Sequence, residues 1–192
     1  ALMKFNEKIF ALQFSDWMPD TSVICKEDDF KLFKEKYSDV ILKPLNGMGG
    51  DSIYKFDKTS EDHLKIFKEL TNNYKTMVMV QNFLPEIYDG DYRILIINGE
   101  PFPIGLARIP QKGSFKGNLA AGGRGEAREL SADQIQASKE IGKILIQEGI
   151  LFAGIDMIGS SLTEINITSP TGAREILTQT GQNPIKALLQ SI

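Results

Sequence analysis

Two carboxylates and one amide near the C-terminal end have the types and spacing of a metal site. The segment 152–166 reads as two apolar strands joined by a Gly-Ser-Ser turn. If the turn centres on Ser160, Asp156 pairs directly with Glu164, and Asn166 lies on the same face two residues further on. At about 5 Å and an effective dielectric near 20, two carboxylates repel by roughly 3 kcal/mol. A divalent cation reverses that sign, and all-oxygen ligands suit Mg²⁺. The alternative is a solvated hairpin edge with one protonated carboxyl group.

A glycine-rich segment between two predicted strands has the composition of a phosphate-binding loop. It reads Lys43-Pro44-Leu45-Asn46-Gly47-Met48-Gly49-Gly50-Asp51-Ser52, and its glycines allow backbone amides to approach phosphate oxygens closely. It lacks the Gly-Lys-Ser/Thr ending of a P-loop, and a serine occupies the place of the third glycine in a dinucleotide fingerprint. No helix is predicted after the loop, so cationic side chains must supply the counter-charge. Lys43, which ends its strand beside the loop, and Lys8, on the first predicted helix, are the candidates.

The second predicted lobe offers five basic residues as further candidates. Arg93 and Arg108 each interrupt or end an otherwise apolar strand, where a forked donor for phosphate or carboxylate offsets its own desolvation. We expect both to be functional. Lys112, Lys116 and Arg124 lie in a glycine-rich loop, and a solvated charged surface explains most clusters of that kind.

The elements that must position these residues indicate an α+β chain of two lobes. Residues 1–83 alternate predicted helices and strands around the glycine-rich loop, and turn-forming residues then mark a hinge. In the second lobe, 84–192, a strong Asn98-Gly99 signal predicts a β-hairpin. A long flexible loop is expected over 109–125. Ser131 then caps a helix that ends at Gly149, immediately before the acidic hairpin.

Composition restricts the class of protein. The 192 residues are 42% hydrophobic with a net charge of −3, so we expect a globular protein without a general nucleic-acid or membrane-surface footprint. One cysteine cannot form an internal disulfide, and neither a signal peptide nor an apolar span of about 20 residues is present. These features predict a cytoplasmic location.

Four motifs in order resemble bacterial glutathione synthetase. They are Asn6-Glu7-Lys8, 43–50, 118–126 and Leu162-Thr163-Glu164-Ile165-Asn166-Ile167-Thr168-Ser169-Pro170. The resemblance covers essentially the whole chain and implies an ATP-grasp fold, in which two lobes with antiparallel sheets enclose the nucleotide. Family members carry a further domain before the region matched by Asn6, so this chain is expected to be the ATP-grasp part of a longer enzyme.

The resemblance also implies roles for individual residues. Lys8 and Lys43 would contact the nucleotide phosphates, Asp91 would lie near the ribose and phosphates, and Arg93 and Arg108 would face the transferring phosphoryl group. The lid over the phosphates would consist of Gly47, Met48, Gly49 and Gly50. Adenine would be held by Gln81, Asn82, Phe83 and Leu84. Mg²⁺, or Mn²⁺ in its place, would be held by Asp156, Glu164 and Asn166. The substrate end would be formed by Arg108, Lys116, Arg124, Ser169 and Thr171.

The implied activity is an ATP-dependent ligation of γ-glutamylcysteine to glycine through an acyl phosphate, giving glutathione, ADP and phosphate. The small molecules would be its only partners, apart from copies of the full-length enzyme in a homo-oligomer. Lys116 stands where the family pattern has arginine, which keeps the charge and loses the planar fork. Two alternatives remain open: an ATP-grasp ligase for another substrate, such as a peptide-glutamate or D-alanine ligase, and a nucleotide-binding fragment without turnover.

Overall fold

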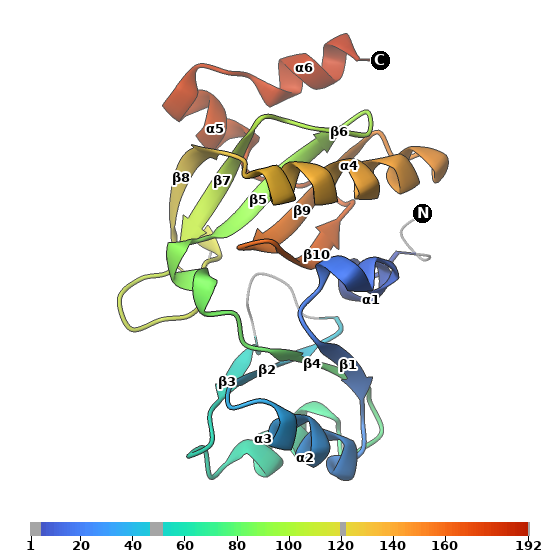
Figure 1. The fold of residues 1–192 in the computed structure, drawn as a ribbon, viewed down its shortest axis with the longest axis vertical. Coiled ribbons are helices and arrows are strands. Elements are labelled where there is room, and N and C mark those ends of the chain that lie inside the picture. Colours follow the sequence, from blue (N-terminus) through green and yellow to red (C-terminus); the bar gives the residue numbers. More distant parts are fainter. Residues whose placement is uncertain (1–4, 47–51, 120–121, 192) are drawn as a thin grey trace. The chain divides into compact units, whose positions relative to one another are not determined.

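The computed structural model describes residues 5–46, 52–119 and 122–191, and the chain divides into two compact units (Figure 1). The small unit is Pro19–Leu84, and the large unit combines Ala1–Met18 with Pro85–Ile192. Each unit is described by itself below.

The first helix belongs to a different unit from the one that the sequence suggested. The division after Leu84 lies one residue from the predicted one, but the residues up to Met18 group with the C-terminal part of the chain. Phe5, Phe10 and Ala11 are buried in the core of the large unit, so apolar burial rather than sequence proximity decides the placement. This grouping differs from the expected first lobe, 1–83, in the placement of the residues before Pro19.

The small unit is a four-stranded antiparallel sheet with helices on one face. Its strand order is β1-β4-β2-β3, with bounds β1 Thr21–Ile24, β2 Val40–Pro44, β3 Tyr54–Phe56 and β4 Val78–Asn82. The helices are α2, Glu27–Lys36, and α3, His63–Leu70. Phe30 of α2 and Phe67 of α3 are fully buried and stack on each other, with ring centroids 4.6 Å apart. They pack on Val40, Leu42 and Val80, which leaves the alternate strand residues on the other face.

The large unit contains a six-stranded sheet of order β10-β9-β5-β7-β8, with β6 paired to β5. Its strands are β5 Asp91–Ile97, β6 Glu100–Pro101, β7 Ile104–Ile109, β8 Arg124–Glu129, β9 Phe152–Ile158 and β10 Ser161–Asn166. Its helical segments are α1 Glu7–Ala11, η1 Leu12–Trp17, η2 Pro85–Asp89, α4 Ala132–Gln147, α5 Ala173–Thr180 and α6 Pro184–Gln190.

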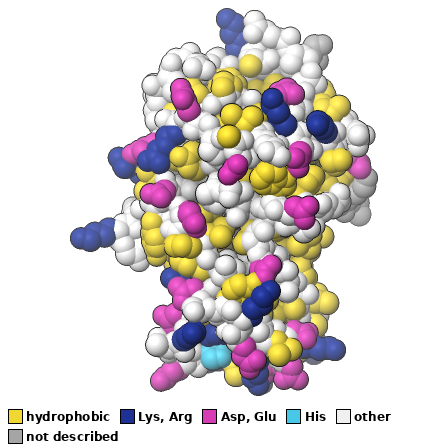
Figure 2. Space-filling model, viewed as in Figure 1, with side chains coloured by type: hydrophobic (Ala, Val, Ile, Leu, Met, Phe, Trp, Pro, Cys, Tyr) yellow, Lys and Arg dark blue, Asp and Glu magenta, His cyan; other side chains and the backbone are white. Residues whose placement is uncertain are grey.

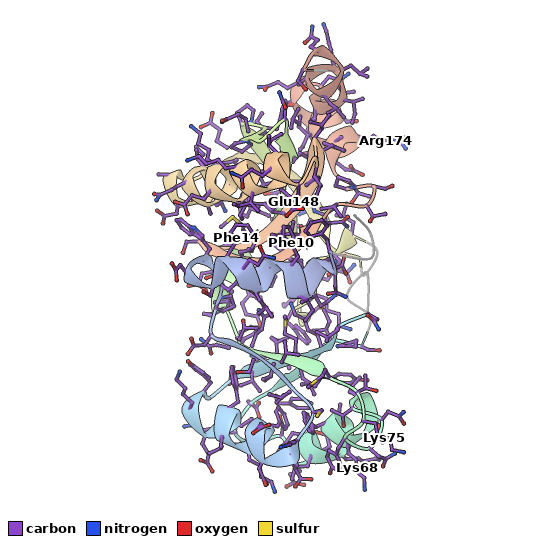
Figure 3. All side chains as sticks on the ribbon, turned by 90° about the vertical axis from the view of Figure 1, so that its right-hand side faces the viewer. Phe10, Phe14, Lys68, Lys75, Glu148 and Arg174 are labelled. Atoms are coloured by element: carbon purple, nitrogen blue, oxygen red, sulfur yellow. The ribbon has the colours of Figure 1, made fainter. Side chains whose placement is uncertain are left out.

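Helices cover both faces of this sheet. On one face, α1 and α4 pack on Ile94, Ile155 and Ile165. Figure 3 shows Phe10 of α1 and Phe14 of η1 on the side of these segments that faces the strands. On the other face, Ile176 of α5 packs on Leu95, Ile104 and Leu106. The second face is only partly apolar, because the charged residues of the site occupy the rest of it.

A side-chain cap at Ser131 begins helix α4, as the sequence predicts. Ser131 accepts a hydrogen bond from the Gln134 amide, and the Gln134 side chain accepts one from the Ser131 amide, which forms a capping box at the start of α4. The Gln134 side chain also donates to the Gly159 carbonyl at 3.1 Å. The start of α4 is thereby tied to the turn of the acidic hairpin.

The long loop is shorter than the sequence suggested. The expected loop 109–125 includes Arg124 and Gly125, which belong to β8 and pair with β7. The residues of β8 are Arg, Gly, Glu, Ala, Arg and Glu. A single alanine makes no apolar stripe, so periodicity could not reveal this edge strand. The Gln179 side chain of α5 bonds to the Gly125 carbonyl and the Ala127 amide, which satisfies part of the outer edge of β8.

Charge is interspersed over the surface. On the face that Figure 2 shows, basic and acidic side chains alternate without a broad region of one sign. No helix among the described residues is long and apolar enough to span a membrane.

Candidate functional site

Three charged residues form one row across the centre of the large sheet. Glu164 of β10 is the register partner of Asp156 on β9, and Asp156 is in turn the partner of Arg93 on β5. Directly paired residues share a face of the sheet, so the three side chains lie on one side. The predicted pairing of Asp156 with Glu164 is confirmed.

The turn between β9 and β10 is shorter than the sequence suggested, and a bulge restores the predicted pairing. Ile158 pairs with Ser161, so the turn has two residues, Gly159 and Ser160. An unbroken ladder from that turn would pair Asp156 with Thr163 and leave Glu164 on the opposite face. The register shifts between Leu162 and Glu164, and this bulge brings Glu164 back beside Asp156.

Asp156 is held by two arginines. Its Oδ1 accepts from Arg93 Nε at 2.5 Å, and its Oδ2 accepts from Arg93 Nη2 at 3.0 Å. Arg108 Nη2 lies 2.9 Å from the same Oδ2. The three side chains are almost fully buried, with residue exposures of 3% for Asp156, 6% for Arg93 and 4% for Arg108. The bidentate geometry and the burial strengthen the attraction between these charges.

Arg108 is shared with a second carboxylate. Its Nη2 donates to Asp91 Oδ2 at 2.5 Å, and its Nε donates to the Asp91 carbonyl at 3.2 Å. Asp91 and Arg108 are register partners on β5 and β7. Asp91 Oδ1 is buried and has no hydrogen-bond partner among the described residues. An orphaned carboxylate oxygen of this kind marks a place where a further donor or cation can bind.

The surroundings shift the pKa values of the two aspartates in opposite directions. Burial raises the pKa of Asp91 to about 6 although Arg108 opposes the shift. Burial also acts to raise the pKa of Asp156, but the charges of Arg108 and Arg93 outweigh it and hold that pKa well below its usual range. Despite its burial, the pKa of Arg108 rises because Asp156 and Asp91 stabilise the cation. Asp156 is therefore an anion throughout the physiological pH range, whereas Asp91 is the weaker acid of the two.

Glu164 has its own cation. Lys8 Nζ lies 3.4 Å from Glu164 Oε1 and 3.0 Å from Glu7 Oε1, and only 3% of the Lys8 side chain is exposed. Asn6 caps α1 by accepting from the amides of Lys8 and Ile9, which fixes the start of the helix on the edge strand β10. Lys8 was predicted to contact phosphates, and the structure places it beside a predicted metal ligand.

A loop after β10 encloses the stem of Arg93. Arg93 Nη1 donates to Thr171 Oγ1 at 3.3 Å. A Cβ added to Gly154 would lie 2.8 Å from both Arg93 Cδ and Pro170 Cβ, and one added to Gly172 would lie 3.3 Å from Arg93 Cγ. The two glycines thus leave the space that the arginine stem fills.

The other residues predicted after β10 lie less centrally. Asn166 Oδ1 accepts from the Thr168 amide at 2.9 Å, and its side chain lies on the same face as Glu164 by strand alternation. Ser169 is exposed and has a positive φ of 50°. Within the part of the chain that the structure describes, neither residue is hydrogen-bonded to Arg93 or Arg108.

One described part of the long loop packs against the Asp91–Arg108 pair. A Cβ on Gly117 would lie 2.5 Å from the Arg108 carbonyl oxygen and 3.1 Å from Asp91 Cβ, so the loop backbone packs directly against this pair. The neighbouring Lys116 is half-buried. Arg124 lies apart, with a side chain that is 74% exposed and pairs with Glu126 at 2.6 Å.

The small unit places two of the remaining predicted residues, Lys43 and Gln81, on the same face of its sheet. Lys43 pairs in register with Met79, and Gln81 pairs with Ile41; these positions alternate with Leu42 and Val80 of the helix-covered core. Lys43 is 4% exposed, and Gln81 is 3% exposed and donates to Thr21 Oγ1 at 2.9 Å. Asn82 ends β4, and Phe83 and Leu84 follow it. The predicted lid residues Gly47, Met48, Gly49 and Gly50 lie outside the described residues.

The oxygen donors of the large unit fit a hard divalent cation. Asp156, Glu164 and Asn166 supply two carboxylates and one amide oxygen on one face, which is the ligand chemistry of Mg²⁺. Among the described residues there is no cluster of three or more His, Cys, Asp or Glu side chains, so further ligands would come from water and phosphate. The predicted repulsion between the carboxylates is offset here by Arg93, Arg108 and Lys8.

Sequence reasoning missed three features of the site: the sharing of Arg108 between two aspartates, the contact of Lys8 with Glu164, and the packing of Gly154 on Arg93. The spacing of Asp91 and Arg93, two residues apart in one strand, was the available signal for the first. No local signal existed for the other two, because they depend on how distant elements pack.

Comparison with known proteins identifies relatives of the whole region. Residues 7–181 match the family described as prokaryotic glutathione synthetase, ATP-grasp domain. The glutathione synthetase of Escherichia coli (strain K12) is 50% identical over 177 residues, which are 92% of this chain and 56% of that protein. The chain therefore spans little more than half the length of this curated relative.

Solved structures with little sequence similarity share the fold. A RiPP-associated ATP-grasp ligase from Chryseobacterium gregarium, solved with ADP and a leader and core peptide, superimposes with a TM-score of 0.69 at 20% identity, covering 97% of this chain and 59% of that one. The ATP-grasp ligase PsnB, solved with a precursor variant, Mg and ADP, gives a TM-score of 0.68 at 18% identity, covering 97% and 57%. These likenesses show an α+β ATP-grasp fold.

Proposed function

Because the chain belongs to the family of prokaryotic glutathione synthetase ATP-grasp domains, we propose that it is the ATP-binding and phosphoryl-transfer part of a ligase. The ligase joins γ-glutamylcysteine to glycine and releases ADP and phosphate. The observation that carries the proposal is the buried Arg93–Asp156–Arg108 cluster within the matched region 7–181. A structural sheet face gains little from burying such a cluster, whereas phosphoryl transfer requires fixed cations and a metal-binding carboxylate.

The reaction needs no side-chain nucleophile. The carboxylate at the cysteine end of γ-glutamylcysteine attacks the γ-phosphate of ATP, and ADP leaves with the bridging oxygen. The amine of glycine then attacks the acyl phosphate, loses a proton and displaces phosphate. The chain's contribution is to orient the reactants and stabilise developing charge.

Each charged residue has a role in that scheme. Arg93 and Arg108 donate to the transferring phosphoryl oxygens, since their guanidinium groups are permanently charged and their planar forks match phosphate oxygens. Lys43 and Lys8 bind the nucleotide phosphates. Asp156, Glu164 and Asn166 would hold Mg²⁺, or Mn²⁺, which supplies neutralisation of the phosphate charge when it is bound.

The remaining predicted residues hold the two ends of the reactants. Adenine lies against Gln81, Asn82, Phe83 and Leu84, and Asp91 lies near the ribose and phosphates. The peptide end is bound by Lys116, Arg124, Ser169 and Thr171 together with Arg108. The backbone near Gly117 shields the acyl phosphate from water, because this part of the loop already packs on Asp91 and Arg108. The full-length enzyme is a homo-oligomer in this proposal.

Calorimetric titration with a non-hydrolysable ATP analogue tests the nucleotide-binding part of the proposal. We expect Mg²⁺-dependent binding, and a loss of about 10- to 100-fold in affinity for Lys43→Met, since hydrogen bonds to charged groups contribute about 1.5–3 kcal/mol. Lys34→Met is the matched control, because Lys34 lies in the same unit and donates to the Asp57 carbonyl. Unchanged affinity in Lys43→Met would contradict the assignment.

ADP release then separates the candidate substrates. Release that requires both γ-glutamylcysteine and glycine supports the proposed reaction. Release with D-alanine or a glutamate-rich peptide instead identifies another ATP-grasp ligase. Nucleotide binding with no release under any of these conditions identifies a binding module without turnover.

A further inference from the structure

We propose that Arg93 and Arg108 determine which cation Asp156 accepts: one that arrives together with a phosphate-bearing ligand, and not a free divalent ion. The inference deepens the proposed function and rests on it for the identity of the phosphate ligand. It concerns this chain's own arginines, which occupy the carboxylate that a metal would use.

Both oxygens of Asp156 are already engaged. Oδ1 accepts one N–H from Arg93, and Oδ2 accepts a second from Arg93 and lies 2.9 Å from Arg108. The Asp156 backbone carbonyl accepts from Thr163 Oγ1 at 3.1 Å, which holds the strand and leaves the carboxylate to the arginines. A carboxylate has about four lone-pair positions, and three of them face guanidinium nitrogens here.

Charge balance opposes a free metal ion. The buried cluster contains two carboxylates, Asp91 and Asp156, and two guanidinium groups, Arg93 and Arg108, so its net charge is zero. A lone divalent ion would place two further positive charges next to two arginines that cannot lose their protons. Exposures of 8% or less for all four residues remove the solvent that would screen the repulsion.

A phosphate reverses this balance. Its oxygens match the planar fork of arginine and compete for it with Asp156. Arg108 can turn from Asp156 and keep Asp91, to which it donates from two of its nitrogens. The anion then draws the guanidinium groups away and frees Asp156 for the accompanying metal.

Glu164, on the edge strand, is paired with a cation as Asp156 is. Glu164 faces Lys8 at 3.4 Å, and Lys8 also contacts Glu7 at 3.0 Å. A phosphate that attracts Lys8 would release Glu164 as well. Each carboxylate proposed to bind metal is therefore held by a cation that is proposed to bind phosphate.

Binding of Mn²⁺ alone, measured by the loss of its free-ion electron paramagnetic resonance signal without nucleotide or substrate, tests the inference. We expect weak binding by the unmodified chain and at least tenfold tighter binding by Arg108→Gln, because removal of one positive charge leaves Asp156 as an uncompensated ligand. Arg128→Gln is the matched control: Arg128 lies on the same sheet, pairs with Glu126 at 2.5 Å and changes the net charge by the same amount. Its Mn²⁺ affinity should equal that of the unmodified chain.

Two further variants keep the test decisive. Arg93→Gln should show the same gain if Arg108→Gln fails to fold, and adding Asp156→Asn to the variant that folds should abolish the gain. Arg108→Lys keeps the charge and should bind Mn²⁺ as weakly as the unmodified chain. Equal affinity of the unmodified chain and both Gln variants, including no binding by any of them, overturns the inference, as does an equal gain in Arg128→Gln. Because the titration contains no nucleotide, its outcome is independent of whether the chain binds ATP or ligates peptides.

Discussion

Two adjacent rows of paired residues in the large sheet differ in character: one row is charged, and the other is apolar. Arg93, Asp156 and Glu164 form one row, and the next residues along two of these strands, Ile94 and Ile165, flank Ile155 in the row beside it. The isoleucines are at most 1% exposed and pack under α1 and α4. The charged row faces the other side and lies partly under the loop that carries Thr171.

This contrast shows how one ladder serves stability and chemistry together. Burial of the isoleucine row fixes the register, because a slip of one residue would expose it and bury the charges against the helices. The same register places the charged residues beside one another. They stabilise it less than the isoleucines do, since desolvation offsets much of the attraction between buried ions. We therefore expect changes in the two rows to affect different properties.

Truncating the central residue of each row, Asp156 or Ile155, should give the largest difference between the effects of the two rows. Asp156→Ala leaves Arg93 without its bidentate partner, and breaking a buried pair in this way costs about 3–5 kcal/mol. Ile155→Ala opens a cavity and costs about 2–5 kcal/mol. Chemical unfolding should show a loss of stability in both, whereas metal-dependent binding of the ATP analogue should disappear only in Asp156→Ala.

Ile155→Val is the control for that pair of variants, with an expected cost of about 0.5–1.5 kcal/mol and unchanged nucleotide binding. Loss of metal-dependent binding in a folded Ile155→Ala chain would show that the rows are not separable. Retention of that binding in Asp156→Ala would remove Asp156 from the metal site.

A smaller effect, confined to the charged row, is pH dependence. The pKa of Asp91 is raised from 3.8 to about 6 in the folded chain, so between these values the folded state binds more protons than the unfolded state. Stability from this group must therefore fall as the pH rises through that window, by up to about 3 kcal/mol. Unfolding of the unmodified chain and of Asp91→Asn, measured from about pH 4 to 7, should differ by a term of this sign and size.

The isoleucine row has no titratable group, so Ile155→Val should follow the pH profile of the unmodified chain. A difference between Asp91→Asn and the unmodified chain that grows in the opposite direction would show that the Asp91 carboxylate is stabilised, rather than destabilised, by its surroundings.

The sequence predicts the charged row well because strand alternation preserves faces. Asn98 and Gly99 predict a two-residue hairpin, whose simple extension pairs Arg108 with Asp89. The structure pairs Arg108 with Asp91, two residues from Asp89, because the register of pairing with β5 changes between Pro101 and Leu106. A shift of two residues does not change the face on which a side chain lies, so the hairpin signal is sufficient for the face of Arg108 but not for its partner.

Other features depend on packing that no local pattern records. The β8 strand has no apolar alternation, and the position of α1 depends on Phe5 and Phe10 finding the core beneath β10. The bulge at Thr163 is a further example, because nothing in the sequence distinguishes a three-residue turn from a two-residue turn followed by a bulge. In each case the decisive free energy comes from contacts between distant residues.

The smallest predicted effect concerns the glycine that precedes the isoleucine row on β9. Gly154 precedes Ile155 and lies against the Arg93 stem, and a Cβ there would meet Arg93 Cδ and Pro170 Cβ at 2.8 Å. Gly154→Ala should cost about 1–3 kcal/mol through overpacking, and it should displace the Arg93 guanidinium from Asp156. We expect weaker binding of the ATP analogue together with tighter binding of free Mn²⁺, since a displaced Arg93 competes less for the carboxylate. Gly149→Ala is the control, because a Cβ there meets nothing within 4 Å although its φ of +74° strains the backbone. It should lower stability alone, and a shift in Mn²⁺ affinity in Gly149→Ala equal to that in Gly154→Ala would show that general loosening, rather than the position of Arg93, controls access to Asp156.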